Sequence, residues 1–576
     1  MIRIGNCSGF YGDRLSAMRE MLEGGDLDVL TGDYLAELTM LILSRDRLSD
    51  DALGYVPTFL AQLRDCLRLA LDRHVRIVTN AGGVNPAALV TAIRSLAAEQ
   101  GLSPTVALVR GDSLGPGSFA YLGAFGIARA MAADIVVTGR VTDASLVIGP
   151  AVAHFGWDRD ALDRLAGATV AGHVLECGTQ ATGGNYPFFT EISDMMAPGF
   201  PIAEISADGS SVITKHPGTG GAVTVGTVTA QLMYEVQDAR YAGPDVTTRL
   251  DTITLRQDGP DRVAISGVRG EPPPPDLKVS RTRIAGYRNE LTVVLTGLDA
   301  EAKAALFRRQ FETALPARPA ELTWTLARVD APDAPTQQQA SALLTVVGRD
   351  ASRGMVDRAF SNTAVQLALG SYPGFFATTP PGPAHPYGVF TAGYVPQGQP
   401  AHEVVLDDGT VERIAPPTAF QALEPLYGAA PLSQDQPAPQ TAPTPFWVGP
   451  SVAPGSDNSP PPSTRRLPLG TIAGARSGDK GGDANIGLWA RRPDAYPWLA
   501  NLISEETVRE LLPETAGKPL LITHLPNLNA VNIVIEGLLG EGVAYQARFD
   551  PQAKGLAEWL RSRHVDIPLS LLEESR

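Results

Sequence analysis

Short apolar segments alternate with helix-like segments in the first part of the chain, and this alternation constrains the fold more than any other feature. The apolar segments lie at residues 27–30, 74–78, 105–109 and 134–137, and each is too short to be a buried helix. Such segments, separated by amphipathic helices, are typical of a mostly parallel β-sheet with helices on its faces. We therefore predict a mostly parallel α/β domain over about residues 1–200.

Glycine and polar residues follow the predicted strands. In parallel sheets, ligands gather at the carboxyl ends of the strands, so we expect these residues to surround one cavity and to bind a substrate. The alternative is that strand-to-helix turns favour these residue types whatever the function. The residues are Asn6, Ser8, Asp33, Asn80, Gly82, Gly83, Arg140 and Asp143.

The pattern changes after residue 200. Strand-like segments are then interspersed with fewer helices, which predicts an α+β subdomain over about residues 201–431, inserted into the first domain or following it. The expected strands lie at 204–214, 250–267, 291–298 and 343–347, and the expected helices at 301–313 and 363–369.

Residues 432–467 are rich in Pro, Ser, Gln, Ala and Thr. Such a segment buries too little apolar surface to offset its chain entropy, so we predict a linker. Strand and helix patterns return over residues 468–576, which predicts a separate, small α+β domain of ferredoxin-like type. The expected organisation is thus a core over residues 1–431, a linker, and a carboxyl-terminal domain.

The small domain opens on the stretch 475–485, Ala-Arg-Ser-Gly-Asp-Lys-Gly-Gly-Asp-Ala-Asn, which we predict to be a loop. Glycine lets backbone amides approach an anion, and Arg476 and Lys480 could neutralise it. Together with Asp479 they are candidate substrate-binding residues. The alternative is a solvated turn between two strands.

Two carboxylates four residues apart, Asp33 and Glu37, are candidate catalytic groups at a predicted helix start. Glu37 could act as a general acid or base if burial raises its pKa. The alternative for Asp33 is a structural role as the cap of the helix. Arg140 could hold a carboxylate or phosphate with both nitrogens, oriented by Asp143, or the two could form a purely structural pair.

Cys177 is a third catalytic candidate, because His173 lies four residues earlier and would share its face on a helix. A neighbouring imidazole could make the thiol a nucleophilic thiolate. The alternative is a small buried side chain. The turn that follows, Gly183, Gly184 and Asn185, is a candidate wall of the binding site.

A further glycine-rich turn, Gly218-Thr219-Gly220-Gly221, follows an apolar strand and precedes a helix-compatible segment. Backbone amides at the start of a helix attract phosphate or carboxylate groups. The turn lacks the Gly-Lys-Ser/Thr ending of a P-loop, so nucleoside triphosphate hydrolysis is not implied. A plain tight turn is the alternative.

Composition narrows the class of protein. The net charge of −15 disfavours nucleic acid and anionic membranes as partners. The three cysteines form no disulfide framework, and the sequence has no apolar segment of about 20 residues. We expect a cytoplasmic homo-oligomer. No metal motif is present, so we expect no metal, with a Mg²⁺ site at Asp13, Asp33 and Asp112 as the alternative.

Eight stretches resemble the acyclic terpene utilisation (AtuA-like) family, including its small carboxyl-terminal domain, and together they span nearly the whole chain outside the linker. They lie at residues 5–14, 33–40, 80–86, 139–146, 176–185, 241–246, 476–483 and 527–532.

The resemblance implies a role in the catabolism of citronellol- and geraniol-like compounds through branched acyl-CoA thioesters. We expect a hydratase, dehydratase or lyase that needs no cofactor besides the CoA of its substrate. Gly82-Gly83 or Gly183-Gly184 would hold the thioester oxyanion, Glu37 or Asp33 would move the proton, and Arg140 or the turn at 218–221 would bind an anionic group.

Two alternatives remain open. Members of the family are encoded beside, or fused to, biotin-dependent acyl-CoA carboxylase components. The first alternative is therefore a noncatalytic binding or assembly subunit that docks with such a carboxylase through the small domain. The second is a hydrolase that uses Cys177 as its nucleophile.

Overall fold

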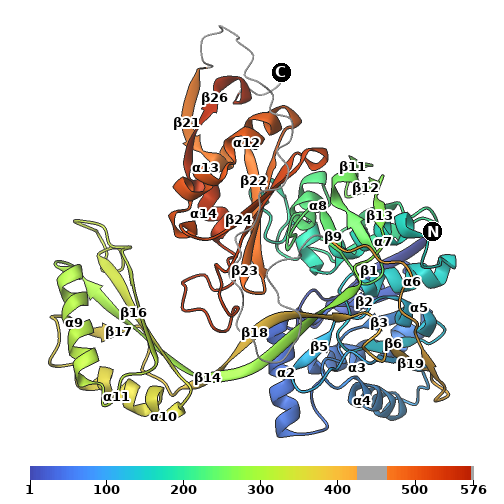
Figure 1. Ribbon diagram of the computed structural model, residues 1–576, viewed down its shortest axis with the longest axis horizontal. Coiled ribbons are helices and arrows are strands. Elements are labelled where there is room, and N and C mark those ends of the chain that lie inside the picture. Colours follow the sequence, from blue (N-terminus) through green and yellow to red (C-terminus); the bar gives the residue numbers. More distant parts are fainter. Residues whose placement is uncertain (424–462, 573–576) are drawn as a thin grey trace. The chain divides into compact units, whose positions relative to one another are not determined.

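The computed structural model describes residues 1–423 and 463–572, which form two compact units (Figure 1). The first unit holds residues 1–281, 391–423, 463–540 and 552–572, and the second holds 282–390 and 541–551. The predicted domain boundaries at residues 431 and 468 stay a prediction, because the first compact unit contains residues from both sides of the predicted linker.

Five parallel strands form the centre of the large sheet in the first unit, in the order β1-β2-β3-β6-β4, which confirms the predicted α/β class. Antiparallel strands extend the sheet at both edges. The central strands are β1 (Ile2–Asn6), β2 (Val29–Gly32), β3 (Arg76–Thr79), β4 (Val106–Arg110) and β6 (Ile135–Thr138). The extensions are β7 (Pro201–Ile205), β8 (Ser211–Lys215), β12 (Val263–Ser266) and β11 (Thr254–Gln257) on one side, and β19 (Glu403–Val405) and β20 (Val411–Arg413) on the other.

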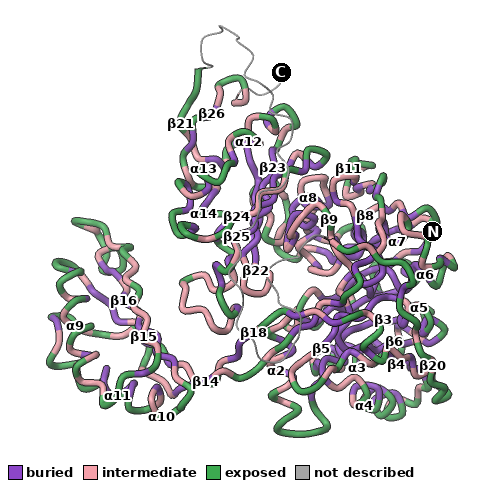
Figure 2. Tube along the Cα trace, viewed as in Figure 1, coloured by how far each residue is buried: buried purple, intermediate pink, exposed green. Residues whose placement is uncertain are grey.

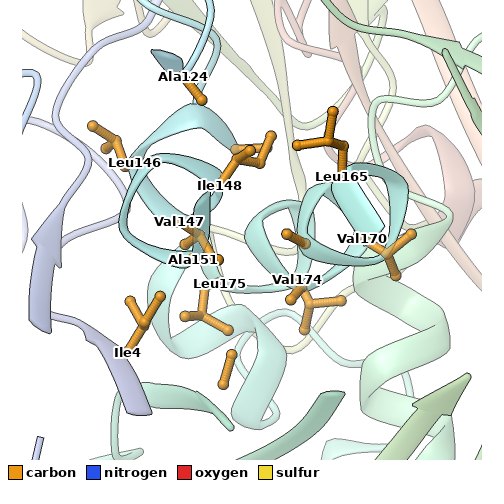
Figure 3. Packing of buried hydrophobic residues seen from close by; sticks show 14 of the residues in the cluster. Ile4, Ala124, Leu146, Val147, Ile148, Ala151, Leu165, Val170, Val174 and Leu175 are labelled. Carbon is orange, nitrogen blue, oxygen red and sulfur yellow. The ribbon is translucent and has the colours of Figure 1, made fainter. Parts of the chain in front are cut away.

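Helices cover both faces of this sheet because successive strand residues point to opposite sides. Val29 belongs to the hydrophobic cluster around α5, α6 and α7, whereas its neighbour Leu30 belongs to the cluster around α1, α3 and α4. Figure 3 shows Ile4 of β1 among buried side chains of α6 and α7. Figure 2 shows the central strands as almost continuously buried. The helices are α1 (Ala17–Glu23), α2 (Glu37–Ser49), α3 (Pro57–Asp72), α4 (Pro86–Glu99), α5 (Phe125–Ala130), α6 (Ser145–Phe155), α7 (Leu162–Leu175) and α8 (Val225–Leu232).

A small antiparallel sheet, β13-β10-β9, belongs to the same unit and precedes the long strand β14 (Asp276–Thr296). The residues of β14 from Thr282 onward belong to the second unit, where the strand pairs with β16. The core of the second unit is aromatic and includes Phe307, Phe311 and Phe360. The short strands of the first unit are β5 (Ser118–Ala120), β9 (Arg240–Ala242), β10 (Thr247–Arg249) and β13 (Arg269–Glu271). The remaining elements are β15 (Glu321–Ala327), β16 (Ser341–Asp350), β17 (Phe376–Ala377), β18 (His385–Pro396), α9 (Ala300–Ala314), α10 (Arg353–Val356) and α11 (Arg358–Gln366).

The carboxyl-terminal domain is a four-stranded antiparallel sheet with the order β22-β23-β25-β24 and helices packed on it, as predicted for a ferredoxin-like domain. Most of the predicted linker lies outside the described residues. Its last residues are instead part of a strand, β21, which pairs with β26. The elements are β21 (Thr464–Pro468), β22 (Ala473–Lys480), β23 (Asp483–Ala490), β24 (Leu520–Leu525), β25 (Ala530–Ile535), β26 (His564–Pro568), α12 (Tyr496–Leu502), α13 (Glu505–Leu511) and α14 (Leu556–Ser562).

The stretch 475–485 is a β-hairpin, so its prediction as a loop is wrong apart from the turn at residues 481–482. Its other glycine serves packing. A Cβ atom at Gly478 would lie 2.4 Å from the ring of Tyr234, which follows α8. In the next strand, a Cβ atom at Gly487 would lie 2.4 Å from the Cβ atom of Met233. Glycine therefore lets the small domain pack closely on the chain that follows α8.

Candidate active site

The loops after three central strands meet at one edge of the sheet. Asn80, after β3, donates from Nδ2 to Oδ1 of Asp33, after β2, over 2.6 Å. The Oδ1 atom of Asn80 accepts the amide of Tyr34 over 2.9 Å. Arg140, after β6, donates from Nη1 to the carbonyl of Leu35 over 3.1 Å. The structure thus brings together residues that the sequence separates by more than a hundred positions.

Asn6 and Ser8, after β1, position their neighbours. Asn6 is buried and donates from Nδ2 to the carbonyl of Leu175 at the end of α7 over 2.6 Å. The hydroxyl of Ser8 donates to the carbonyl of Phe10 over 2.9 Å, and its carbonyl accepts the amide of Asp33 over 3.1 Å. These bonds fix the segments that carry Asp33 and the residues following α7.

Arg140 is buried and lies between acidic and aromatic groups. Its Nη2 atom donates to Oδ1 of Asp143 over 2.5 Å, and its guanidinium carbon lies 4.2 Å from the centre of the Tyr121 ring. Its backbone amide donates to Asp112 over 2.8 Å. The predicted pair of Arg140 and Asp143 is therefore present, in a setting where an isolated charge would be costly.

Glu37 is held as an ionised carboxylate. Its Oε1 atom accepts from the hydroxyl of Tyr121 over 3.1 Å and from Nζ of Lys278 over 3.4 Å. Burial opposes ionisation, but the charges of Lys278, Arg140 and Lys480 outweigh it and lower the pKa of Glu37 to about 2. The acid–base role considered for Glu37 requires a net rise of its pKa, which the structure does not give, so Glu37 is a poor proton carrier near neutral pH.

Asp33 has the opposite electrostatics. Burial raises its pKa well above the usual range, and the negative charge of Asp143 adds to this effect, while Arg140 and Asn80 oppose it. Burial likewise raises the pKa of Asp143 to about 6. Asp33 is not the predicted helix cap, since α2 begins at Glu37. A buried carboxyl group whose pKa is raised is suited to general acid–base chemistry.

His173 pairs with Glu176 at the end of α7. Its Nδ1 atom lies 2.9 Å from Oε1 of Glu176. Burial disfavours the charged imidazolium, but Glu176 outweighs burial and raises the pKa of His173. The ring centre lies 5.1 Å from that of Tyr241. His173 is thus a second group that can hold or release a proton in the same interior.

Cys177 does not share a helical face with His173, because α7 ends at Leu175. Burial raises the pKa of the Cys177 thiol well above its usual range, and the charges of Glu176 and Glu235 add to this effect. The thiol is therefore protonated at neutral pH, which disfavours the predicted nucleophile.

We expect Cys177 in the native protein to react with iodoacetamide at pH 8 at least about tenfold more slowly than an exposed cysteine, because only the thiolate attacks. Peptide mass spectrometry at timed intervals measures the rate, and the urea-unfolded protein is the control. Modification of Cys177 at the same rate in both states would contradict the assignment of a protonated thiol.

Strand β22 of the small domain contributes charges to the same interior. Arg476 is buried with its guanidinium carbon 4.4 Å from the centre of the Tyr234 ring. Lys480 places Nζ 5.9 Å from the centre of the Tyr241 ring, which also contacts His173. Lys480 lowers the pKa of Glu37, so its charge acts on the α/β part. The structure therefore brings Arg476 and Lys480 next to the residues at the sheet edge.

Asp479, on the same strand, has a pKa raised to about 7 by burial and by the charges of Glu235 and Glu37, with Lys554 opposing. In the unfolded chain it ionises near the ordinary value of about 3.9. Between these pH values only the folded state keeps the proton, so this group lowers the stability as pH rises from about 4 to 7.

We expect the melting temperature of Asp479→Asn, relative to wild type, to increase across this window and to stay constant above it. A difference independent of pH would contradict the raised pKa.

Several buried polar atoms in this region have no hydrogen-bond partner among the described residues, and others lie elsewhere in the protein. Buried polar groups in proteins are nearly always paired, so we take the atoms of this region as candidate contacts for a bound molecule. Gln231 contacts this group of residues in two places. Its Nε2 atom donates to the carbonyl of His173 over 3.2 Å, and its side chain contacts Cys177, which directly follows Glu176. Among the described residues, these atoms include Nε of Arg140, Nε2 of His173, Oε2 of Glu176, Oε1 of Gln180, Oε1 of Gln231 and Nη1 of Arg476.

Three of the four glycine amides predicted to hold an oxyanion have partners within the chain. The amide of Gly83 donates to the carbonyl of Asn80, that of Gly183 to Gln180, and that of Gly184 to Thr179. A Cβ atom at Gly82 would lie 2.3 Å from the carbonyl oxygen of Thr138, so glycine serves close packing there. Asn185 is exposed. These turns therefore shape the loops and do not offer the predicted donors at Gly83, Gly183 and Gly184.

The turn Gly218-Thr219-Gly220-Gly221 is also self-contained. The amide of Gly221 donates to the carbonyl of Asp194 over 2.6 Å, and the amide of Thr219 to that of His216. Helix α8 starts three residues after the turn and is capped by Thr224. Two of the amides that the predicted anion site would use, those of Thr219 and Gly221, are therefore already bonded, which favours the alternative of a plain tight turn.

Asp13, Asp33 and Asp112 do not form the alternative Mg²⁺ site. Across residues 1–423 and 463–572, no cluster of three His, Cys, Asp or Glu residues could hold a metal ion. Asp13 instead accepts the amide of Gly9 over 2.7 Å, and Asp112 accepts that of Arg140.

Sequence reasoning missed several residues of this interior. Most of them lie outside any recognisable motif, and Tyr241, although it opens the stretch 241–246, carries no signal of a role in the site. Glu235 has a left-handed backbone with φ of 58°, held by a hydrogen bond of 2.9 Å from its amide to Oδ1 of Asn485. A non-glycine residue in this region is uncommon and often marks a functional site. The missed residues are Tyr121, Gln231, Tyr234, Glu235, Tyr241 and Lys278.

Comparison with known protein families gives two matches to the chain. The model of the family described as "Acyclic terpene utilisation family protein AtuA" matches residues 2–118 and 116–406. The chain belongs to this family. The AtuA ferredoxin-like domain matches residues 467–566, the region of β22 and its sheet. The residues at the sheet edge thus belong to the AtuA family region, and Arg476 to its ferredoxin-like domain. No curated protein and no solved structure matches the chain.

The family's association with terpene utilisation agrees with the expected pathway in its broad form. Among the described residues, none of the helices combines the length and the apolar character that a membrane span requires.

Proposed function

We propose that this member of the AtuA family is an enzyme that acts on a branched, terpenoid acyl-CoA thioester by proton transfer, as a hydratase, a dehydratase or a carbon–carbon lyase. One observation carries the proposal: Asp33, with its raised pKa, is buried beside Asn80 and the ion pair of Arg140 and Asp143. The family's association with acyclic terpene utilisation supports the class of substrate.

These reactions share their chemical requirements. Each needs a group that accepts a proton, a group that donates one, and a donor that stabilises the negative charge on the thioester oxygen. Asp33 and His173 are our candidates for the first two roles, because the surroundings raise the pKa of each and the charge of Glu176 acts on both. Nε of Arg140, a buried donor with no partner, takes the role predicted for the glycine amides. CoA enters as part of the substrate, so the proposal needs no separate cofactor.

Deuterium incorporation tests the proposal whichever of these reactions takes place. The purified protein is incubated in ²H₂O with citronellyl-CoA, geranyl-CoA and their 3-hydroxy derivatives, and the thioesters are analysed by mass spectrometry. We expect at least one to gain deuterium on carbon, to gain or lose water, or to be cleaved. If none changes although the protein binds them and captures an acyl-CoA carboxylase, the noncatalytic assembly role replaces this proposal.

A further inference from the structure

Arg476 differs from the other two buried arginines among the described residues in forming no ion pair. The described residues include three buried arginines, Arg140, Arg349 and Arg476. Arg140 pairs with Asp143, and Arg349 pairs with Glu321. Among the described residues, Arg476 forms no ion pair, and its Nη1 atom is buried without a hydrogen-bond partner.

The surroundings of Arg476 fix its guanidinium in place. The ring of Tyr234 covers one face of the group at 4.4 Å. Gly478, two residues further along β22, packs closely against the same ring. Cys177 and Glu235 lie near enough to influence its charge. An immobilised guanidinium is a preformed receptor for an anion, because little rotamer entropy is lost on binding.

The neighbouring groups select the kind of anion. The negative charge of Glu235 acts on this part of the site, so a doubly charged phosphate would be repelled more than a singly charged carboxylate. A carboxylate is also planar and matches the edge of a guanidinium with two parallel hydrogen bonds. We propose that Arg476 binds a carboxylate of the substrate that is remote from the thioester, so the substrates are acyl-CoA thioesters with a second carboxyl group.

This inference rests on the proposed function and makes the small domain part of the active site. The ring of Tyr241 contacts both His173 of the α/β part and Lys480 of β22. A substrate that reaches from Asp33 to Arg476 would therefore be held by both domains. Discrimination between acyl chains with and without the second carboxyl group then depends on a residue of the small domain.

Matched pairs of thioesters test the inference by isothermal titration calorimetry. The pairs are succinyl-CoA with butanoyl-CoA, glutaryl-CoA with pentanoyl-CoA, and adipoyl-CoA with hexanoyl-CoA. We expect wild type to bind the dicarboxylic member at least tenfold more tightly in one or more pairs. We expect Arg476→Gln to reduce this preference to within about twofold, while the affinity for the monocarboxylic member stays nearly unchanged. Arg476→Lys keeps the charge but loses the planar fork, so its preference should be intermediate.

Arg466→Gln is the matched control, because Arg466 is an exposed arginine of the same domain, and it should keep the wild-type preference. Equal affinity of wild type for both members of every pair would overturn the inference while leaving a thioester enzyme in place. A preference that survives in Arg476→Gln would also overturn it, as would a tenfold loss of affinity for CoA alone, which would assign Arg476 to a CoA phosphate. Failure of wild type to bind any of these thioesters would overturn the inference, whereas the deuterium experiment with the terpenoid thioesters tests the proposed function separately.

Discussion

Asp33→Asn is expected to lower the rate of proton transfer to the acyl-CoA substrate by at least about 100-fold, the range typical for loss of a general acid or base. Asparagine has nearly the same shape but cannot take up or release a proton, whereas Asp33 can, with a pKa that burial raises. The fold should be retained, because its side-chain oxygen can still accept from Nδ2 of Asn80 and from the amide of Leu35. Deuterium incorporation in ²H₂O measures the rate, and the melting temperature measures the fold.

Asp28→Asn is the matched control for this variant. Asp28 is exposed at the opposite end of the same strand, where it accepts the amide of Arg3 over 2.7 Å. It should keep the wild-type rate. A rate for Asp33→Asn within threefold of wild type would remove Asp33 from the mechanism and leave His173 as the proton carrier of this interior.

Arg140→Leu is expected to lower the free energy of unfolding by about 3–5 kcal/mol, the usual cost of removing one partner of a buried ion pair. The change leaves Asp143 without its partner at 2.5 Å and the carbonyl of Leu35 without its donor. Urea unfolding followed by tryptophan fluorescence measures the effect. The double variant Arg140→Leu with Asp143→Leu should recover part of the loss, because it removes the uncompensated charge.

Arg269→Leu serves as the control for this second prediction. Arg269 forms an ion pair of 2.6 Å with Asp163, but 69% of its side chain is exposed. Exposed pairs contribute little because water screens them. If Arg140→Leu costs no more than Arg269→Leu, the pair of Arg140 and Asp143 does not stabilise the sheet edge as the structure indicates.

Much of the fold follows from local sequence pattern. The apolar segments at 27–30, 74–78, 105–109 and 134–137 correspond to β2, β3, β4 and β6, because strand length and the helices between them are properties of neighbouring residues. The meeting of Asn80 and Asp33 also follows, since the carboxyl ends of parallel strands share one edge. The periodicity of the sequence therefore predicts the strands and helices of the sheet and the candidate site residues at the ends of its strands.

The chemical state of the site depends on contacts that are distant in sequence. The pKa of Glu37 is lowered chiefly by Lys278, which lies 241 positions away. The amide of Gly221 is bonded to Asp194, which no turn rule predicts. Composition also misleads where glycine serves packing, as for Gly478 against Tyr234. Sequence patterns thus identify which residues are candidates for the site. They cannot assign the protonation state of a side chain or show whether a backbone amide is free to bind a ligand.

A crystal structure of the Asp33→Asn variant with bound geranyl-CoA would test most directly whether the interior between the sheet edge and β22 is the active site. We predict the thioester oxygen within about 3 Å of Nε of Arg140 or Nε2 of His173, with the acyl chain running toward Arg476. An acyl chain bound elsewhere on the protein, with these buried atoms contacted only by water, would contradict it.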